Sequence, residues 1–162
     1  MKNRGFSLIE LIVVVAIMAV ALAVGGYSLS AISLANAKNC ATEIKSSLEK
    51  TRTQACSSDN STSTATLSLY RDSASNKVCI SKNYEGTPKE IGSKAVSVRY
   101  RLKGDTSYQD LGTTALKFGF DRSTGGFKSV DGATIVEEIQ ISSGGRTYTL
   151  TCYGLTGKIK ME

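Results

Sequence analysis

The feature that most restricts this chain is a long stretch without charge near its start. Residues 11–37 contain no charged side chain, and residues 11–24 are apolar throughout. About 20 apolar residues, at ~1.5 Å of helix each, cross the ~30 Å hydrocarbon core of a bilayer. Lys2 and Arg4 precede the stretch, and basic residues there favour a cytoplasmic N-terminus. The sequence therefore predicts one membrane-spanning helix with its N-terminus in the cytoplasm.

Two processing schemes fit this beginning. In the first, residues 1–4 and 11–20 are the basic and apolar regions of an ordinary signal peptide, and cleavage after Ala23 releases a soluble protein. In the second, the string Gly5-Phe6-Ser7-Leu8-Ile9-Glu10 marks a cleavage site ahead of a retained helix. A charge well inside a bilayer costs roughly 2.5–3.5 kcal/mol, so Glu10 requires a partner in that scheme.

The beginning of the chain resembles the type IV pilin superfamily, which includes pilins, type II secretion pseudopilins and competence pilins. Its hallmark is a short basic leader ending in Gly, then Phe, a small or hydroxyl residue, Leu, Ile or Val, and Glu before an apolar helix; residues 1–24 match it throughout. The resemblance implies that a membrane aspartyl peptidase, the prepilin peptidase, cuts between Gly5 and Phe6 and methylates the new amine of Phe6. It also implies a precursor in the cytoplasmic membrane, an inner-membrane assembly platform, and a polymer with other pilin subunits outside that membrane.

Glu10 has a physical role in such a filament. The cationic amine of Phe6 in one subunit can pair with Glu10 of a neighbour, and because both lie in apolar surroundings, an unpaired charge is penalised and the pair sets the register. An interfacial Glu10 that reaches lipid headgroups is the alternative. Gly25 and Gly26 each cost a helix roughly 1 kcal/mol relative to Ala, so they form a soft point or simply allow close helix packing.

The apolar pattern changes after Tyr27. Small and apolar residues recur at spacings of three and four up to Ala55, while charged residues occupy the other faces, which predicts an amphipathic continuation of the helix. We therefore expect a leader at residues 1–5, a transmembrane or filament-core helix at 6–27, its amphipathic continuation at 28–56 and a β-rich head at 57–162. The recurring positions are Ala37, Ala41, Ile44, Leu48, Thr51 and Ala55.

Beyond Ser63 the period becomes two, as in Val96, Val98, Tyr100 and Leu102. About seven such strands joined by short turns, one of them at residues 121–126, predict an α+β fold in which one antiparallel sheet packs on the helical spine. The glycine pattern that ends in Gly157-Lys-Ile resembles the heads of the minor pseudopilin and FimT-like branch.

Four cysteines without a close pair argue against zinc or redox chemistry and allow structural disulfides. Cys40 and Cys56 are 16 residues apart, about 24 Å along a helix, whereas a disulfide allows ~6 Å between α-carbons. Each would have to bond Cys79 or Cys152. We favour Cys56 with Cys79 and Cys40 with Cys152, and the alternative is four reduced, packed thiols.

Enzymatic function is not expected. The chain has no His, the usual acid/base group near neutral pH, and we find no catalytic, metal or cofactor motif. Its net charge of +6 falls to +4 without Lys2 and Arg4. A basic row of Arg99, Arg101 and Lys103 on one strand face could contact DNA or an acidic partner subunit, although a solvated strand face is the simpler reading.

Overall fold

The computed structural model describes residues 7–57, 65–85, 87–132 and 134–162, with side chains throughout except at residues 24–32. The described residues form one helix and ten strands. The chain divides into two compact units, Met1–Ile32 and Ser33–Glu162. The helix α1, Leu8–Ser57, contributes residues to both units, and all of the strands belong to the second.

Helix α1 begins where a serine can cap it. The Ser7 carbonyl accepts hydrogen bonds from the amides of Glu10 (3.1 Å) and Leu11 (3.2 Å), and the Ser7 hydroxyl also accepts one from the Glu10 amide at 3.3 Å. Serine is a preferred residue at this position because its oxygen satisfies an amide that has no partner within the helix. The helix ends at Ser57, close to the predicted end near Ala55.

The second unit contains two antiparallel five-stranded sheets, in the orders β3-β2-β1-β6-β7 and β10-β9-β8-β4-β5. The predicted α+β class is confirmed, but the prediction of one sheet with about seven strands is wrong. Four strands of two to four residues, β3, β5, β7 and β10, are too short to show clear alternation in the sequence. The strands are β1 Thr66–Arg71, β2 Val78–Lys82, β3 Lys89–Gly92, β4 Ser97–Leu102, β5 Gln109–Asp110, β6 Leu116–Phe120, β7 Phe127–Lys128, β8 Val136–Ser143, β9 Arg146–Cys152 and β10 Ile159–Met161.

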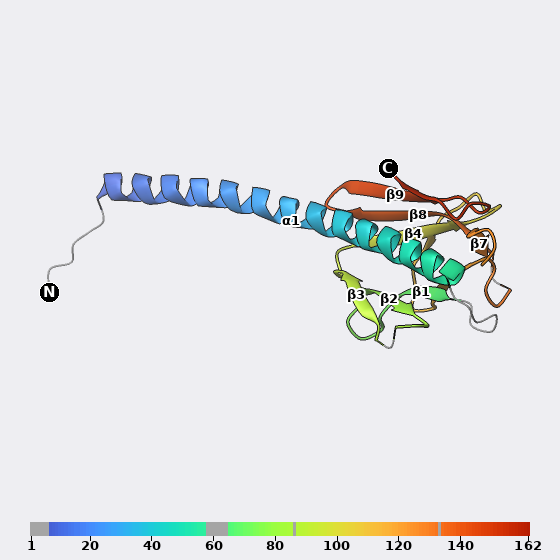
Figure 1. Cartoon of the computed structure of the whole chain (residues 1–162). Helices are drawn as coiled ribbons and strands as arrows, with labels where there is room; N and C mark the ends of the chain where they lie inside the picture. Colours follow the sequence, from blue (N-terminus) through green and yellow to red (C-terminus); the bar gives the residue numbers. More distant parts are fainter. Residues whose placement is uncertain (1–6, 58–64, 86, 133) are drawn as a thin grey trace. The chain divides into compact units, whose positions relative to one another are not determined.

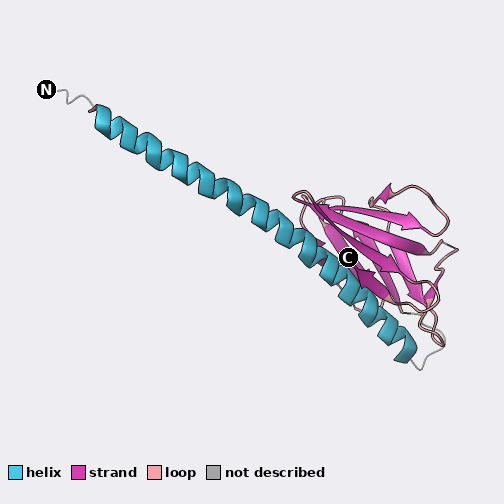
Figure 2. Cartoon of the chain, turned by 90° about the horizontal axis from the view of Figure 1, so that it is seen from above, coloured by secondary structure: helices cyan, strands magenta, loops and turns pink. Residues whose placement is uncertain are grey.

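The core lies between the second half of α1 and the inner faces of both sheets. Figure 1 and Figure 2 show this half of the helix alongside the strands. All six positions that the sequence assigns to the inner face of the helix are buried, including the hydroxyl-bearing Thr51. Ile44 and Leu48 are fully buried in the same cluster as Leu69 of β1 and Ile139 of β8. Full burial of one such side chain stabilises the fold by about 1.5–3 kcal/mol, so the helix is an integral part of this unit.

Three connections share one turn geometry: residues 72–77, 121–126 and 153–158. In each, the first amide donates to the carbonyl of the sixth residue, and the fifth amide donates back to the first carbonyl, at 2.7–2.9 Å. The fifth residue has a positive φ in every case: 54° at Asn76, 68° at Gly125 and 64° at Gly157. Glycine and asparagine adopt this conformation at least cost, which explains their place in the pattern.

Two of these turns interlock beside the end of α1. The Phe127 amide donates to the Gly154 carbonyl at 2.7 Å, which connects the β6–β7 turn of one sheet to the β9–β10 turn of the other. Arg52 of α1 donates from Nε to the Gly125 carbonyl at 3.0 Å. A β-carbon placed on Gly157 would lie 1.8 Å from that same carbonyl oxygen. Glycine is therefore required where the helix and both sheets meet.

The turn at residues 121–126 makes the folding stability of the protein depend on pH in the acidic range. Asp121 Oδ1 accepts bonds from the Ser123 hydroxyl (2.6 Å) and the Thr124 amide (3.0 Å), and these bonds lower the pKa of Asp121 to about 2. Because the folded pKa lies below the unfolded one, near 3.9, the stabilisation is complete above the unfolded value and is lost as the pH falls towards 2. We expect Asp121→Asn to lower the melting temperature at pH 6 and to lose that effect near pH 2.

The measurement is thermal unfolding of the full chain in detergent at both pH values. Asp105→Asn is the matched control, since among the described residues only the Gln109 amide, at 3.4 Å, donates to the Asp105 carboxylate. A difference between wild type and Asp121→Asn that stays constant from pH 6 to pH 2 would contradict the assigned role.

Candidate functional site

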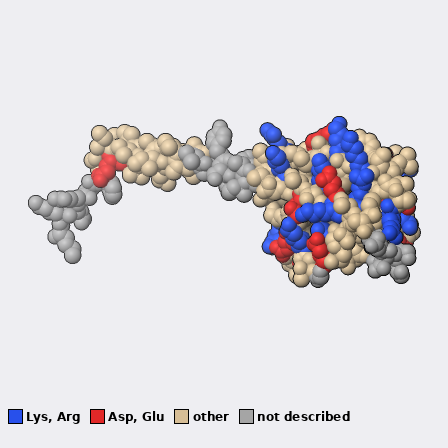
Figure 3. All heavy atoms as spheres, viewed as in Figure 1, with Lys and Arg blue, Asp and Glu red and all other residues tan. Residues whose placement is uncertain are grey.

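The first half of α1 is an exposed apolar surface. Every side chain from residue 8 to residue 23 is exposed, and the larger apolar ones range from 46% at Val14 to 78% at Leu8. Glu10 is the only charged residue between positions 5 and 37. Figure 3 shows this segment as uncharged apart from one acidic group. A soluble monomer rarely exposes so large an apolar surface, which is typical of segments that pack against lipid or other proteins.

Glu10 lies in the first turn of α1, which begins at Leu8. Its amide is bonded to Ser7, so Ser7 and Glu10 occupy the first and last positions of a Ser-x-x-Glu capping pattern. A carboxylate in the first turn is also stabilised by the positive end of the helix dipole. Sequence reasoning missed this role for Ser7, although the spacing of the two residues was visible.

Several predicted residues of this segment remain untested. Gly5 and Phe6 lie outside the described residues. Gly25 and Gly26 have helical backbone conformation within α1, and their role as a soft point stays a prediction. Among the described residues, we find no helix whose length and apolarity together suffice for a membrane crossing, so the predicted span is not confirmed.

The predicted disulfides are wrong, because all four cysteines are free. Cys56 and Cys79 lie on different sides of one sheet. Val78 and Ile80 belong to the core beneath the helix, so Cys79 between them points to the opposite face, where its thiol contacts the Lys77 carbonyl at 3.8 Å. Cys56 instead lies on α1, next to Gly125. Closeness in sequence was therefore a poor guide to this pairing.

Cys40, on α1, and Cys152, at the end of β9, lie at different levels along the helix axis. Cys40 Sγ packs against Gly92. Strand β9 begins at the hairpin beside Ser33 and ends at Cys152. Cys152 is therefore close to Gly154 and to the interlocked turns beside Arg52. Arg52 lies 12 residues beyond Cys40, about 18 Å of helix, which exceeds the ~6 Å that a disulfide allows between α-carbons. Both thiols are packed in the core instead.

Burial makes these thiols unreactive. It raises the pKa of Cys40 and of Cys152 to about 12, and it also raises the pKa of Cys79. A rise of three units lowers the thiolate fraction about a thousandfold. We expect a maleimide to label Cys56, the exposed thiol, within minutes and to label all four only after unfolding. Recovery of fewer than four thiols from the unfolded, unreduced chain would instead demonstrate a disulfide.

The basic row on β4 is neutralised by acidic neighbours. Arg99 pairs with Asp110 at 3.0 Å, and Arg101 pairs with Glu137 at 2.8 Å and with Glu138 at 3.1 Å. Hydrogen bonds from the Tyr108 hydroxyl and from Arg101 lower the pKa of Glu138, so this carboxylate stays ionised near neutral pH.

Lys103, the third member of the row, has no ion pair among the described residues. The row as a whole is therefore not an open basic surface for DNA phosphates.

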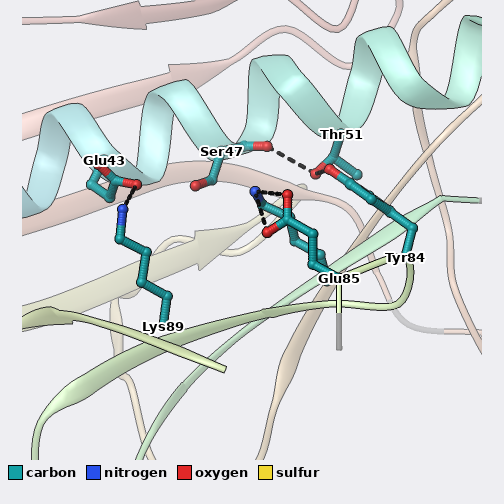
Figure 4. Close-up of polar contacts among 7 residues, drawn as sticks. Glu43, Ser47, Thr51, Tyr84, Glu85 and Lys89 are labelled. Atoms are coloured by element: carbon teal, nitrogen blue, oxygen red, sulfur yellow. Dashed lines mark hydrogen bonds and ion pairs between the residues drawn. The ribbon is translucent and has the colours of Figure 1, made fainter. Parts of the chain in front are cut away.

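A set of polar contacts joins α1 to the β2–β3 connection and to the start of β3, as Figure 4 shows. The Thr51 hydroxyl bonds the Tyr84 hydroxyl at 3.0 Å, and Lys89 Nζ donates to Glu43 at 2.6 Å. Lys82, only 9% exposed, is neutralised by both oxygens of Glu85 at 2.9 and 3.0 Å. The contacts of Thr51 and Glu43 therefore fix the helix to the first sheet. No group of three potential metal-ligating side chains occurs in the described part of the chain.

Comparison with known proteins adds one finding. Residues 1–26 match the prokaryotic N-terminal methylation motif. Neither the curated proteins nor the solved structures gave a significant match to the chain. The match covers the residues from which the sequence resemblance was drawn, and it leaves the branch unspecified. The chain thus begins with the prepilin-type motif of type IV pilins and pseudopilins, and residues 8–26 of that motif belong to helix α1.

Proposed function

We propose that this protein is a structural subunit of a type IV pilus or of a type II secretion-like pseudopilus. One observation carries the proposal: the methylation motif at residues 1–26 includes the exposed apolar half of α1, in which Glu10 is the single charged residue. Such a segment requires lipid or other apolar helices around it. The head formed by Ser33–Glu162 then carries the surface that the filament presents to solvent.

Processing is the first step of the proposed function. Prepilin peptidase cuts between Gly5 and Phe6 on the cytoplasmic side, where glycine leaves the scissile bond accessible, and then methylates the Phe6 amine. The cut removes Lys2 and Arg4, so the segment that enters the filament has lost its two cytoplasmic charges. Until assembly, the apolar helix anchors the precursor in the cytoplasmic membrane.

Assembly then depends on the pairing of two charges. The Phe6 amine of an incoming subunit meets Glu10 of a neighbour within a bundle of apolar helices, where a lone charge is strongly unfavourable. The benefit is register between subunits more than raw stability, because desolvation of both charges offsets much of their attraction. Ser7 supports this arrangement by capping the turn that contains Glu10.

The test is a search for the chain in filaments. Surface structures sheared from cells that express an epitope-tagged full chain should contain it, and cells without prepilin peptidase should keep the longer precursor in the membrane fraction. A chain found only as a soluble species, with or without the peptidase, would overturn the proposed function.

A further inference from the structure

Exposed positive side chains lie at one end of the second unit. It is the end where α1 begins to pack on the sheets. Gly144, in the β8–β9 hairpin, lies against Ser33, since a β-carbon added there would be 2.9 Å from that of Ser33. Gly92, just before the β3–β4 connection, lies against Cys40 in the same way, at 3.1 Å from its Sγ. Figure 1 shows this hairpin and this connection at the same end of the unit.

Each of these segments carries an exposed cation. Lys38 lies on α1 between Ser33 and Cys40, Lys94 follows Gly92, and Arg146 follows the hairpin glycines. None of the three has an ion pair among the described residues. They contrast with the row on β4, where Arg99 and Arg101 are both neutralised.

The other charged groups at this end leave an excess of positive charge. Lys77 and Glu90 pair with each other at 2.6 Å. Arg71 donates to the carbonyls of Asn76 and Val96 and has no carboxylate partner among the described residues. Asp72 is the nearby acid without a cation, and its Oδ2 accepts bonds from the amide and hydroxyl of Ser75 at 2.7 and 2.8 Å. Glu162, whose backbone pairs with Thr149 near Arg146, is already paired with Lys160. The three exposed cations and Arg71 therefore have no carboxylate partner among the described residues.

We propose that this basic end, defined by Lys38, Lys94 and Arg146, docks on the anionic phosphates of lipid headgroups before the subunit leaves the membrane. The inference rests on the proposed function, because it requires the apolar half of α1 to be the anchor. Only six residues separate Tyr27, the predicted end of the anchor, from Ser33, which is about 9 Å of helix. That distance is close to the ~8 Å over which charges act at physiological salt, and lysine and arginine side chains shorten it further.

The consequence is a preferred orientation of the membrane-bound precursor. Basic residues near an anionic surface are attracted to it, and the attraction is lost at high salt. The same contact must break when the subunit is extracted, so anionic lipid slows the transfer into a filament. Neutral lipid removes the contact without affecting the anchor.

Hydrogen exchange of the full chain in nanodiscs tests the docking. In discs with about one third phosphatidylglycerol, we expect amides in the β3–β4 connection and the β8–β9 hairpin to exchange roughly tenfold more slowly than in pure phosphatidylcholine discs. High salt should abolish the difference. So should the triple variant Lys38→Gln, Lys94→Gln, Arg146→Gln. The matched control is the triple variant Lys103→Gln, Lys128→Gln, Lys158→Gln, which removes the same charge outside the basic end. It should retain the difference in exchange between the two lipids.

Three results would overturn the docking. One is equal exchange in the two lipids, and another is an equal loss of protection in both triple variants. The third is protection in neutral discs that grows with the protein-to-lipid ratio, which would assign the basic end to an acidic face of a second copy. Failure of the proposed function is distinguishable, since a chain without an anchor would not enter discs of either composition.

Discussion

Glu10→Ala should abolish incorporation of the chain into filaments while leaving the precursor open to cleavage. The variant leaves the Phe6 amine of each incoming subunit without a counter-charge among apolar helices. Removing one partner of a buried ion pair costs about 3–5 kcal/mol, which corresponds to a reduction of roughly 100-fold to 4000-fold per subunit added. The measurement is an immunoblot of sheared filaments against the membrane fraction.

Two further variants separate the charge of Glu10 from its place in the helix cap. Ser7→Ala removes the hydroxyl that accepts a hydrogen bond from the Glu10 amide at 3.3 Å. The loss of this cap lowers helix stability by about 1 kcal/mol, so incorporation should fall no more than about fivefold. Glu10→Gln keeps the shape and loses the charge, and it should behave like Glu10→Ala. Wild-type incorporation of Glu10→Gln would show that the carboxylate charge is not needed.

Gly157→Ala should cause the largest loss of stability among single substitutions at the interlocked turns. The residue has φ 64°, which costs an L-amino acid about 1–2 kcal/mol, and its new β-carbon would lie 1.8 Å from the Gly125 carbonyl oxygen. Relief of that overlap requires one turn to move, which breaks the contacts around Arg52. We expect a loss of about 3 kcal/mol or more, or about 10 °C in melting temperature.

Gly104→Ala is the matched control for this experiment. Gly104 also has a positive φ, 93°, but nothing lies within 4 Å of the position of an added β-carbon. Its effect should therefore be limited to backbone strain, about 1 kcal/mol. Both variants are compared with wild type by thermal unfolding of the full chain in detergent. Equal melting temperatures for Gly157→Ala and Gly104→Ala would mean that the two turns are not interlocked.

The helix could be predicted in detail because its evidence is local. The spacing of Ala37, Ala41, Ile44 and Leu48 specifies one face of a helix, and all four are fully buried. The turn at residues 121–126 was also predictable, since its glycines permit a positive φ. Both signals depend on neighbours in sequence and need no knowledge of the rest of the fold.

The sheets and the cysteines depend on distant partners, which period-two alternation does not identify. Alternation in β4 was clear, yet nothing local indicated that it pairs with β8 and β5 in a separate sheet. The acidic partners of Arg99 and Arg101 come from those same two strands, so the charge of the row could not be judged from β4 alone. Likewise, the face on which Cys79 lies follows from the burial of Val78 and Ile80.

The most direct test of the central claim is mass spectrometry of the N-terminal peptide of the mature protein isolated from its host. The proposed function predicts a chain that begins at Phe6 and carries one additional methyl group on its α-amine. A mature chain that begins at Val24, the residue after the alternative cleavage site at Ala23, would contradict it.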